Sequence, residues 1–134
     1  MSIEILPLVL LMFFHFVCDF ILQKPSWAKN KSNSSKELFK HVSMYTLIFI
    51  IPCLIFSFNL IQIVSFLLIT FQLHFIIDEY TSKITSNQFK ELNNQKDSLP
   101  NFGPFTTIGF DQFLHFISLV FTVDKQQLRT DYFQ

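Results

Sequence analysis

Four long apolar segments, separated by polar connections, dominate this chain of 134 residues. About 20 consecutive apolar residues in a helix cross the ~30 Å hydrocarbon core of a bilayer. Charged residues make up only 15% of the chain, whereas a soluble domain carries ~25%. The pattern predicts an all-α polytopic membrane protein with four transmembrane helices packed as a bundle. The expected helices cover residues 3–23, 36–58, 60–84 and 106–123.

Local signals refine these boundaries. Ser34 or Ser35 is a suitable N-cap for the second helix, because a hydroxyl oxygen accepts a bond from a free N–H of the first turn. Pro52 predicts a kink inside that helix. The polar connection between the third and fourth helices has room for a short amphipathic helix around 87–94. The length of the chain predicts one membrane domain, 1–134.

Ionisable side chains inside the apolar segments are the second informative feature. Three of the four histidines lie four residues from an aspartate, a spacing that places both side chains on one face of an α-helix. Ionisable groups are costly inside a membrane, so each one suggests a function. The pairs are His15/Asp19, His74/Asp78 and Asp111/His115, and His41 opens the second apolar segment.

The order of the helices predicts that these groups meet. Successive helices cross in opposite directions, so the ends of the first and third lie beside the starts of the second and fourth. The ionisable groups occupy those same positions and therefore share one layer. A lone histidine in an apolar helix is usually a hydrogen-bonded core residue. Seven groups at matching depth on four helices instead predict a common polar site in the bundle.

Histidine and carboxylate together favour transition metals, of which Zn²⁺ is expected first and Mn²⁺ or Fe²⁺ are possible. The expected metal ligands are His15, Asp19, His74 and Asp78. His41, Asp111 and His115 would form a second metal site, orient the ligands, or act as catalytic acid and base. A metal-free hydrogen-bonded network with a structural or proton-transfer role is the alternative.

The two cysteines, Cys18 and Cys53, lie in apolar stretches and are expected to be free, buried thiols. Cys18 falls between His15 and Asp19, so a role as a soft metal ligand is possible but less favoured. Its spacing from His15 already turns it inward.

The lysines predict the orientation of the bundle. Eight lysines lie in the first and third connections, whereas only Lys125 and Arg129 lie on the opposite side. The positive-inside rule makes the lysine-rich side cytoplasmic, which leaves both termini outside and the His/Asp site facing the cytoplasm. We interpret these lysines as setting topology rather than binding lipid headgroups. The net charge is zero, which gives no electrostatic case for nucleic-acid binding.

The polar motifs resemble those of a known family. The run His15-Phe16-Val17-Cys18-Asp19-Phe20-Ile21-Leu22-Gln23 resembles the H-x-x-x-D-F-x-x-Q signature of the DUF3307 family of small bacterial and phage membrane proteins. The resemblance extends over nearly the whole chain and names no substrate. It implies a membrane location and marks Gln23 and Gln112 as further candidates for binding a substrate or cofactor. The other matching residues are Trp27, Lys31, His41, His74-Phe75-Ile76-Ile77-Asp78, Tyr80 and Asp111-Gln112-Phe113-Leu114-His115.

These observations favour a metal-dependent membrane hydrolase acting on a lipid-linked or amphipathic substrate, although the residues alone do not establish an enzyme. A transport component for a divalent ion or protons is the first alternative, and with four helices it would require a homo-oligomer. Haem ligation is less favoured because the aspartates have no role in it. A purely structural membrane protein would not need so many converging ionisable groups. Membrane lipid is the expected partner.

The predicted orientation can be tested by cysteine labelling in intact cells. A membrane-impermeant maleimide should label Gln127→Cys, which lies on the predicted outer side, and should leave Ser32→Cys unlabelled until the membrane is opened. Labelling of Ser32→Cys from outside would contradict the assignment.

Overall fold

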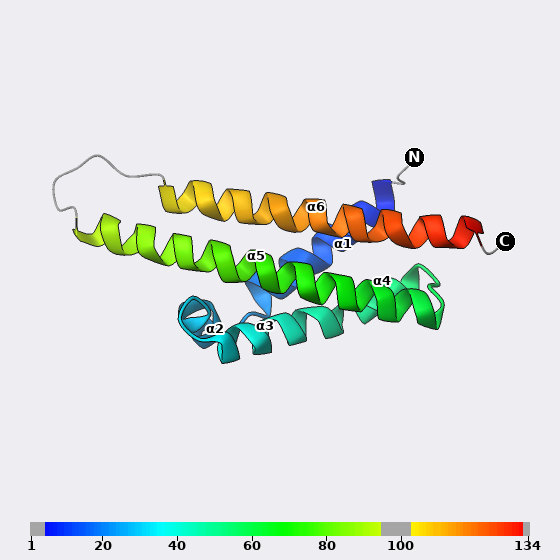
Figure 1. Cartoon of the computed structure of the whole chain (residues 1–134), viewed down its shortest axis with the longest axis horizontal. Helices are drawn as coiled ribbons and strands as arrows, with labels where there is room; N and C mark the ends of the chain where they lie inside the picture. Colours follow the sequence, from blue (N-terminus) through cyan, green and yellow to red (C-terminus); the bar gives the residue numbers. More distant parts are fainter. Residues whose placement is uncertain (1–4, 95–102, 133–134) are drawn as a thin grey trace.

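The computed structural model describes residues 5–94 and 103–132, and within these ranges every regular element is a helix. The two longest helices, α5 and α6, lie side by side and antiparallel, while α3 and α4 pack along α5 and α1 crosses behind it (Figure 1). The expectation of an all-α protein is therefore confirmed. The elements are α1 (Ile5–Phe16), the π-helix η1 (Val17–Ile21), α2 (Pro25–Asn30), α3 (Ser35–Ile48), α4 (Ile50–Ile55), α5 (Leu60–Asn94) and α6 (Gly103–Tyr132).

Three helical stretches in the described ranges are long and apolar enough to cross a membrane. They are Ser35–Ile55, Leu60–Asn94 and Gly103–Asp124. The first apolar helix, Leu6–Ile21, is shorter. The chain thus has the helices of a polytopic membrane protein, and four spans remain a prediction. The start of α1 and the end of α6 lie toward one end of the assembly, and α2 lies toward the other (Figure 1).

The first apolar segment departs from the uniform α-helix that was expected. After Phe16 the backbone widens into η1, in which the Leu22 N–H donates to the Val17 carbonyl at 2.9 Å. This wider turn buries Cys18 and Asp19. Single π-turns of this kind occur frequently at functional sites. A further short helix, α2, replaces part of the expected polar loop and begins at Pro25, a residue suited to the first helical position.

The second apolar segment follows its local signals. Ser34 is the N-cap of α3, and its side chain accepts from the Glu37 N–H. The helix is interrupted at Phe49, between α3 and α4. Pro52 explains the break, because its ring has no N–H to donate to Ile48 and crowds the carbonyl four residues back. The predicted kink is confirmed, three residues before the proline.

The third apolar segment starts with a reciprocal cap and runs further than expected. The Asn59 N–H donates to Gln62 Oε1 at 2.9 Å, and the Gln62 N–H donates to Asn59 Oδ1 at 3.0 Å. From there α5 continues for 35 residues to Asn94, about 52 Å at 1.5 Å per residue. The separate amphipathic helix expected over 87–94 is wrong, because this stretch is the polar end of α5. Its length carries α5 beyond a ~30 Å apolar layer.

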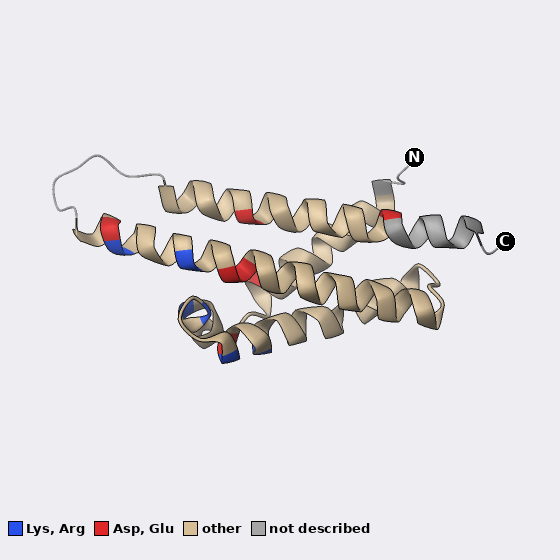
Figure 2. Ribbon diagram, viewed as in Figure 1, with Lys and Arg blue, Asp and Glu red and all other residues tan. Residues whose placement is uncertain are grey.

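Aromatic packing fills the interior toward the end where α4 meets α5. Tyr45 stacks on Phe49 with ring centroids 4.6 Å apart, and Phe49 lies 6.2 Å from Phe66. Cys18 and Cys53 are buried there as free thiols, as expected. Charged residues are absent from α4 and from the adjoining half of α5, and they gather over α2, the start of α3 and the other half of α5 (Figure 2). The ionisable site lies where these two regions meet.

Candidate metal centre

The seven ionisable groups predicted to converge do meet between the helices. All four histidine side chains are buried, with at most 2% of their surface exposed, and Asp19 and Asp78 are buried with them. Asp111 is partly exposed. The groups come from every long element of the fold: His15 from α1, Asp19 from η1, His41 from α3, His74 and Asp78 from α5, and Asp111 and His115 from α6.

Four side-chain atoms form the tightest set in this cluster. His41 Nε2 lies 3.1 Å from His74 Nε2, 3.4 Å from Asp19 Oδ1 and 3.3 Å from Asp78 Oδ2. His74 Nε2 lies 3.7 Å from Asp19 Oδ1 and 3.5 Å from Asp78 Oδ2. These five distances differ little from one another, so each of the two carboxylate oxygens lies close to both nitrogens. His41, His74 and Asp78 form a group that could hold a metal ion, and Asp19 adjoins it.

These spacings suit neighbouring ligand atoms on a metal ion such as zinc. Bonds of ~2.0–2.1 Å from zinc to nitrogen or oxygen place neighbouring ligand atoms ~3.3–3.4 Å apart in a tetrahedron. The distances of 3.1–3.7 Å in this set bracket that value. In addition, Asp19 Oδ1 is buried and has no hydrogen-bond partner among the described residues. A buried carboxylate oxygen without a donor is costly, and a cation bound beside the two histidines would satisfy it.

Proton positions also favour a cation between the two histidines. A neutral imidazole carries one N–H, so two facing Nε2 atoms can share at most one proton, and the other atom presents a lone pair. Whichever of His41 and His74 lacks the proton therefore turns its Nε2 lone pair toward the carboxylate oxygens of Asp19 and Asp78. Lone pairs directed at one point repel each other unless a cation lies there. The residues therefore fit a divalent transition metal.

The formal charge points the same way. Asp19, Asp78 and Asp111 contribute three negative charges, and Lys31 is the one ammonium within hydrogen-bonding distance of a described carboxylate in the cluster. With neutral histidines the sum is −3 + 1 = −2, which one divalent cation balances. Protonation of two histidines would balance it too, and this corresponds to the metal-free network.

A second group of ligand atoms shares Asp78. Asp78 Oδ1 lies 3.3 Å from His115 Nε2, which is 3.5 Å from Asp111 Oδ1. The other carboxylate oxygen of Asp78 belongs to the four-atom set, so this residue bridges the two groups. Asp111 Oδ1 also accepts from the Thr81 hydroxyl at 2.6 Å. The second group has three candidate ligands and is the more open of the two.

His15 keeps the contact with Asp19 that its spacing suggested, and with Asp19 and His74 it forms another group that could hold a metal ion, but it also has two closer partners. Gln112 Nε2 donates to Asp111 Oδ2 at 3.0 Å, so its Oε1 faces His15 Nε2, which must donate, at 2.8 Å. The Tyr45 hydroxyl then donates to His15 Nδ1 at 2.9 Å. His15 Nε2 remains 3.7 Å from Asp19 Oδ2. The predicted roles stay predictions, but this geometry favours His41 over His15 as the partner of His74.

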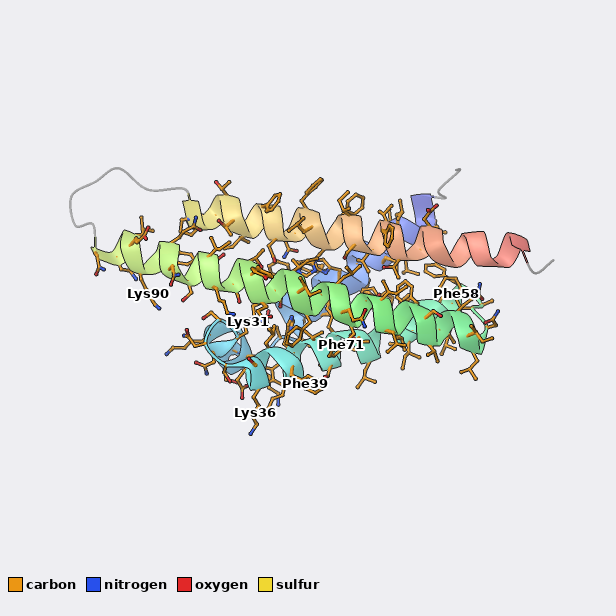
Figure 3. All side chains as sticks on the ribbon, in the orientation of Figure 1. Lys31, Lys36, Phe39, Phe58, Phe71 and Lys90 are labelled. Atoms are coloured by element: carbon orange, nitrogen blue, oxygen red, sulfur yellow. The ribbon has the colours of Figure 1, made fainter. Side chains whose placement is uncertain are left out.

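Lys31 was matched to the family motif but was not expected in the site. Its Nζ donates to Asp78 Oδ2 at 2.9 Å from the end of α2, and Figure 3 shows it on the side of α2 that faces α5. Burial by itself would lower the pKa of Lys31, but the Asp78 carboxylate more than offsets this, so the pKa lies above its ordinary value. No periodicity could reveal this contact, because it joins a loop to a helix.

Two other residues of the site could have been found from helical spacing. Tyr45 lies one turn after His41, and Thr81 lies three residues after Asp78. Both positions fall on the inward face by the same rule that selected the histidines. Gln112, marked by the family resemblance, binds His15 and Asp111. Gln23, marked in the same way, lies at the edge of the cavity described next.

A cavity of about 770 Å³ leads from the cluster toward the lysine-rich end of the molecule. Small-molecule sites typically have ~300–1,000 Å³. The cavity lies among α2, η1, the polar half of α5 and the start of α6. Asp19, Lys31 and Asp111 belong both to its lining and to the cluster. The candidate metal centre is thus reachable from this side.

Fold and site define a helical protein of membrane type with a buried His/Asp centre that could hold a metal ion. The chain belongs to the DUF3307 family, described as a protein of unknown function, whose family model matches residues 7–133. The resemblance read from the motifs is therefore confirmed. No curated protein and no solved structure matches the chain.

The support of His15 by Tyr45 can be tested by a single hydroxyl deletion. Tyr45→Phe leaves His15 Nδ1 buried without a donor, so we expect a loss of about 1–3 kcal/mol of stability. Thermal unfolding of the detergent-purified protein measures it. Tyr80→Phe is the matched control, because Tyr80 is 67% exposed. Equal unfolding temperatures for the two variants would show that the Tyr45 hydroxyl makes no such contribution.

Proposed function

We propose that this protein is a membrane-embedded, metal-dependent hydrolase acting on a lipid-linked or amphipathic substrate from the cytoplasmic side. The observation that carries the proposal is the four-atom set of Asp19, His41, His74 and Asp78, in which both carboxylates lie within 3.7 Å of the two facing histidine nitrogens and Asp19 borders a cavity. Mixed nitrogen and oxygen ligands favour Zn²⁺, with Mn²⁺ or Fe²⁺ as the next candidates, over Mg²⁺ or Ca²⁺.

The division of roles follows from the contacts. Asp19, His41, His74 and Asp78 would hold the ion, which when bound supplies a Lewis acid that activates water and polarises a carbonyl or phosphoryl oxygen. Asp111 faces the cavity and is oriented by the hydroxyl of Thr81 and the amide of Gln112. It is therefore placed to accept a proton from a nucleophile in the cavity.

His115 would complete this pair. Its Nε2 lies 3.3 Å from Asp78 Oδ1 and 3.5 Å from Asp111 Oδ1, so it could exchange a proton with Asp111, while Asp78 would be one of the residues that hold the ion. His15 would act indirectly, since its bond to Gln112 fixes the amide that orients Asp111. A second ion on Asp78, Asp111 and His115 is the other arrangement that these contacts support.

A transport role is supported by a different observation. Tyr45, His15, Gln112 and Asp111 form a continuous chain of hydrogen bonds that ends at the cavity. His15 and Asp111 are groups of the kind that carry protons in membrane transporters, and the Gln112 amide holds them in place. The cavity next to the four-atom set favours the hydrolase, because a relay does not need a chamber of this size.

Metal content tests the proposal most directly. Wild-type protein purified without chelator should contain a stoichiometric transition metal, most of all Zn²⁺, and His74→Ala should lose nearly all of it because one of four ligands is gone. Membrane insertion should persist, since an apolar replacement eases it. Thr70→Ala, a buried change one turn away on α5, is the control. His15→Ala should retain more metal than His41→Ala.

Elemental analysis of these variants gives the answer. A wild-type protein without stoichiometric metal would contradict the hydrolase and leave the metal-free network.

The proposed acid/base role requires a separate variant. Asp111→Asn should keep the metal of the four-atom set and lower the turnover of a phosphate or carboxylate ester in detergent micelles by roughly 10²–10⁴-fold, as expected for the loss of a general base. Elemental analysis and product release are measured on the same sample. Unchanged turnover in Asp111→Asn would remove this residue from the mechanism. A fully metallated wild type that hydrolyses no ester but conducts ions in liposomes would favour transport.

A further inference from the structure

Two residues in the lining of the cavity beside the metal centre carry hydrogen-bond donors that have no partner among the described residues. Gln23 Nε2 and Ser82 Oγ are both buried and have no hydrogen-bond partner among the described residues, and both residues line the cavity. Buried donors without acceptors are uncommon and costly in native proteins. They indicate that an acceptor group belongs in this space.

The charges around the cavity select the kind of acceptor. Lys31 lies at its inner end, where the ammonium is held by Asp78 and only 17% of the side chain is exposed. Lys29 and Lys90 line the cavity as well and are exposed. The acidic lining residues are Asp19 and Asp111, and the first of these would be neutralised by a bound divalent ion. A positively charged space with unpaired donors suits a group that only accepts hydrogen bonds.

We propose that this cavity binds the phosphate group of an amphipathic substrate, a deepening that rests on the metal-dependent function proposed above. The phosphate would lie against Lys31, Gln23 and Ser82, beside the metal centre. Tetrahedral phosphate oxygens accept several charge-assisted bonds at once. A sugar or other neutral headgroup would gain nothing from the charge of Lys31, whereas a phosphate would.

The apolar residues of the lining indicate where the rest of the substrate lies. Phe20 and Phe89 line the cavity and remain exposed on the outer surface of η1 and α5, Phe20 by 55% and Phe89 by 37%. An acyl chain leaving the cavity over Phe20 would pass directly to the apolar surface of the helices. The polar end of the cavity, by contrast, is bordered by Lys29 and Lys90. This polarity matches an anionic lipid that enters from the membrane.

The experiment compares three probes on the metal-loaded protein in neutral detergent. Dioctanoyl phosphatidic acid should bind at least roughly tenfold more tightly than dioctanoylglycerol, which has the same chains and no phosphate. Inorganic phosphate is the third probe. If inorganic phosphate displaces phosphatidic acid only at a much higher concentration, the ligand is a lipid phosphate. If inorganic phosphate binds as tightly as the lipid, the same site takes its phosphate from a soluble compound. Equal binding of phosphatidic acid and dioctanoylglycerol overturns the proposal.

Variants assign the binding to the cavity. Lys29→Ala combined with Lys90→Ala removes two charges at exposed positions and should weaken phosphatidic acid binding roughly tenfold without affecting the fold. Lys31→Met should weaken it further. Lys36→Ala is the matched control, because Lys36 is exposed on the same side of the chain but points away from the cavity (Figure 3). An equal loss in Lys36→Ala and in the double variant would mean that only surface charge is involved, and would overturn the site.

Ser82→Ala separates binding from structure. Because the hydroxyl has no partner among the described residues, its removal should leave the unfolding temperature unchanged or raise it, while binding of phosphatidic acid weakens several-fold. A lower unfolding temperature with unchanged binding would overturn the role assigned to Ser82. Metal content measured on the same samples distinguishes a failure of the phosphate site from a failure of the metal-dependent function. Full metallation without phosphate selectivity refutes only the present inference, whereas loss of metal in wild type refutes the function on which it rests.

Discussion

The carboxylate of Asp78 is the group on which the arrangement of the helices depends. It is 1% exposed, and both of its oxygens are engaged, Oδ2 with Lys31, His41 and His74 and Oδ1 with His115. A charge buried in this way is tolerated only when its partners are held in place. Those partners come from α2, α3 and α6, so the three elements are fixed around α5 by one side chain. The two carboxylate oxygens also connect the two groups of candidate metal ligands.

Helical spacing predicted the part of the site that lies on regular helices. His74 and Asp78 on α5 do share a face, as do Asp111 and His115 on α6, and both pairs point inward. The convergence of all seven groups was predictable because alternating helix directions place them in one layer. The same argument placed His15 near Asp19, and the two side chains do lie 3.7 Å apart. What the spacing did not predict is that Asp19 lies inside η1 and also contacts His41, and that His15 bonds to Tyr45 and Gln112 as well.

Local chemistry explains which boundaries were predictable. Ser34 and Pro52 act through their own hydrogen bonds and sterics, and both had the predicted effect. The continuation of α5 to Asn94 was not predictable in this way, because the polar end of α5 lies beside α6 and its helical state depends on that contact as well as on its own sequence. Lys31 lies outside any periodic pattern, and only the folded position of α2 brings it to Asp78. A single sequence does not reveal long-range contacts of this kind between a loop and a helix.

The position of the site along the helices links its chemistry to the membrane. The aromatic core around Phe49 and Phe66 lies on one side of the cluster, and the lysine-bordered cavity lies on the other. An ionisable centre in the middle of the apolar layer would be far more costly than one at its edge. At the edge, the buried carboxylates can be balanced by Lys31 from a polar connection and by an ion that enters through the cavity. The same edge is where a lipid headgroup lies while its chains stay in the bilayer. In the proposed function, this one position of the cluster therefore meets two requirements. It keeps the cost of burying charge low, and it gives the site access to an amphipathic substrate.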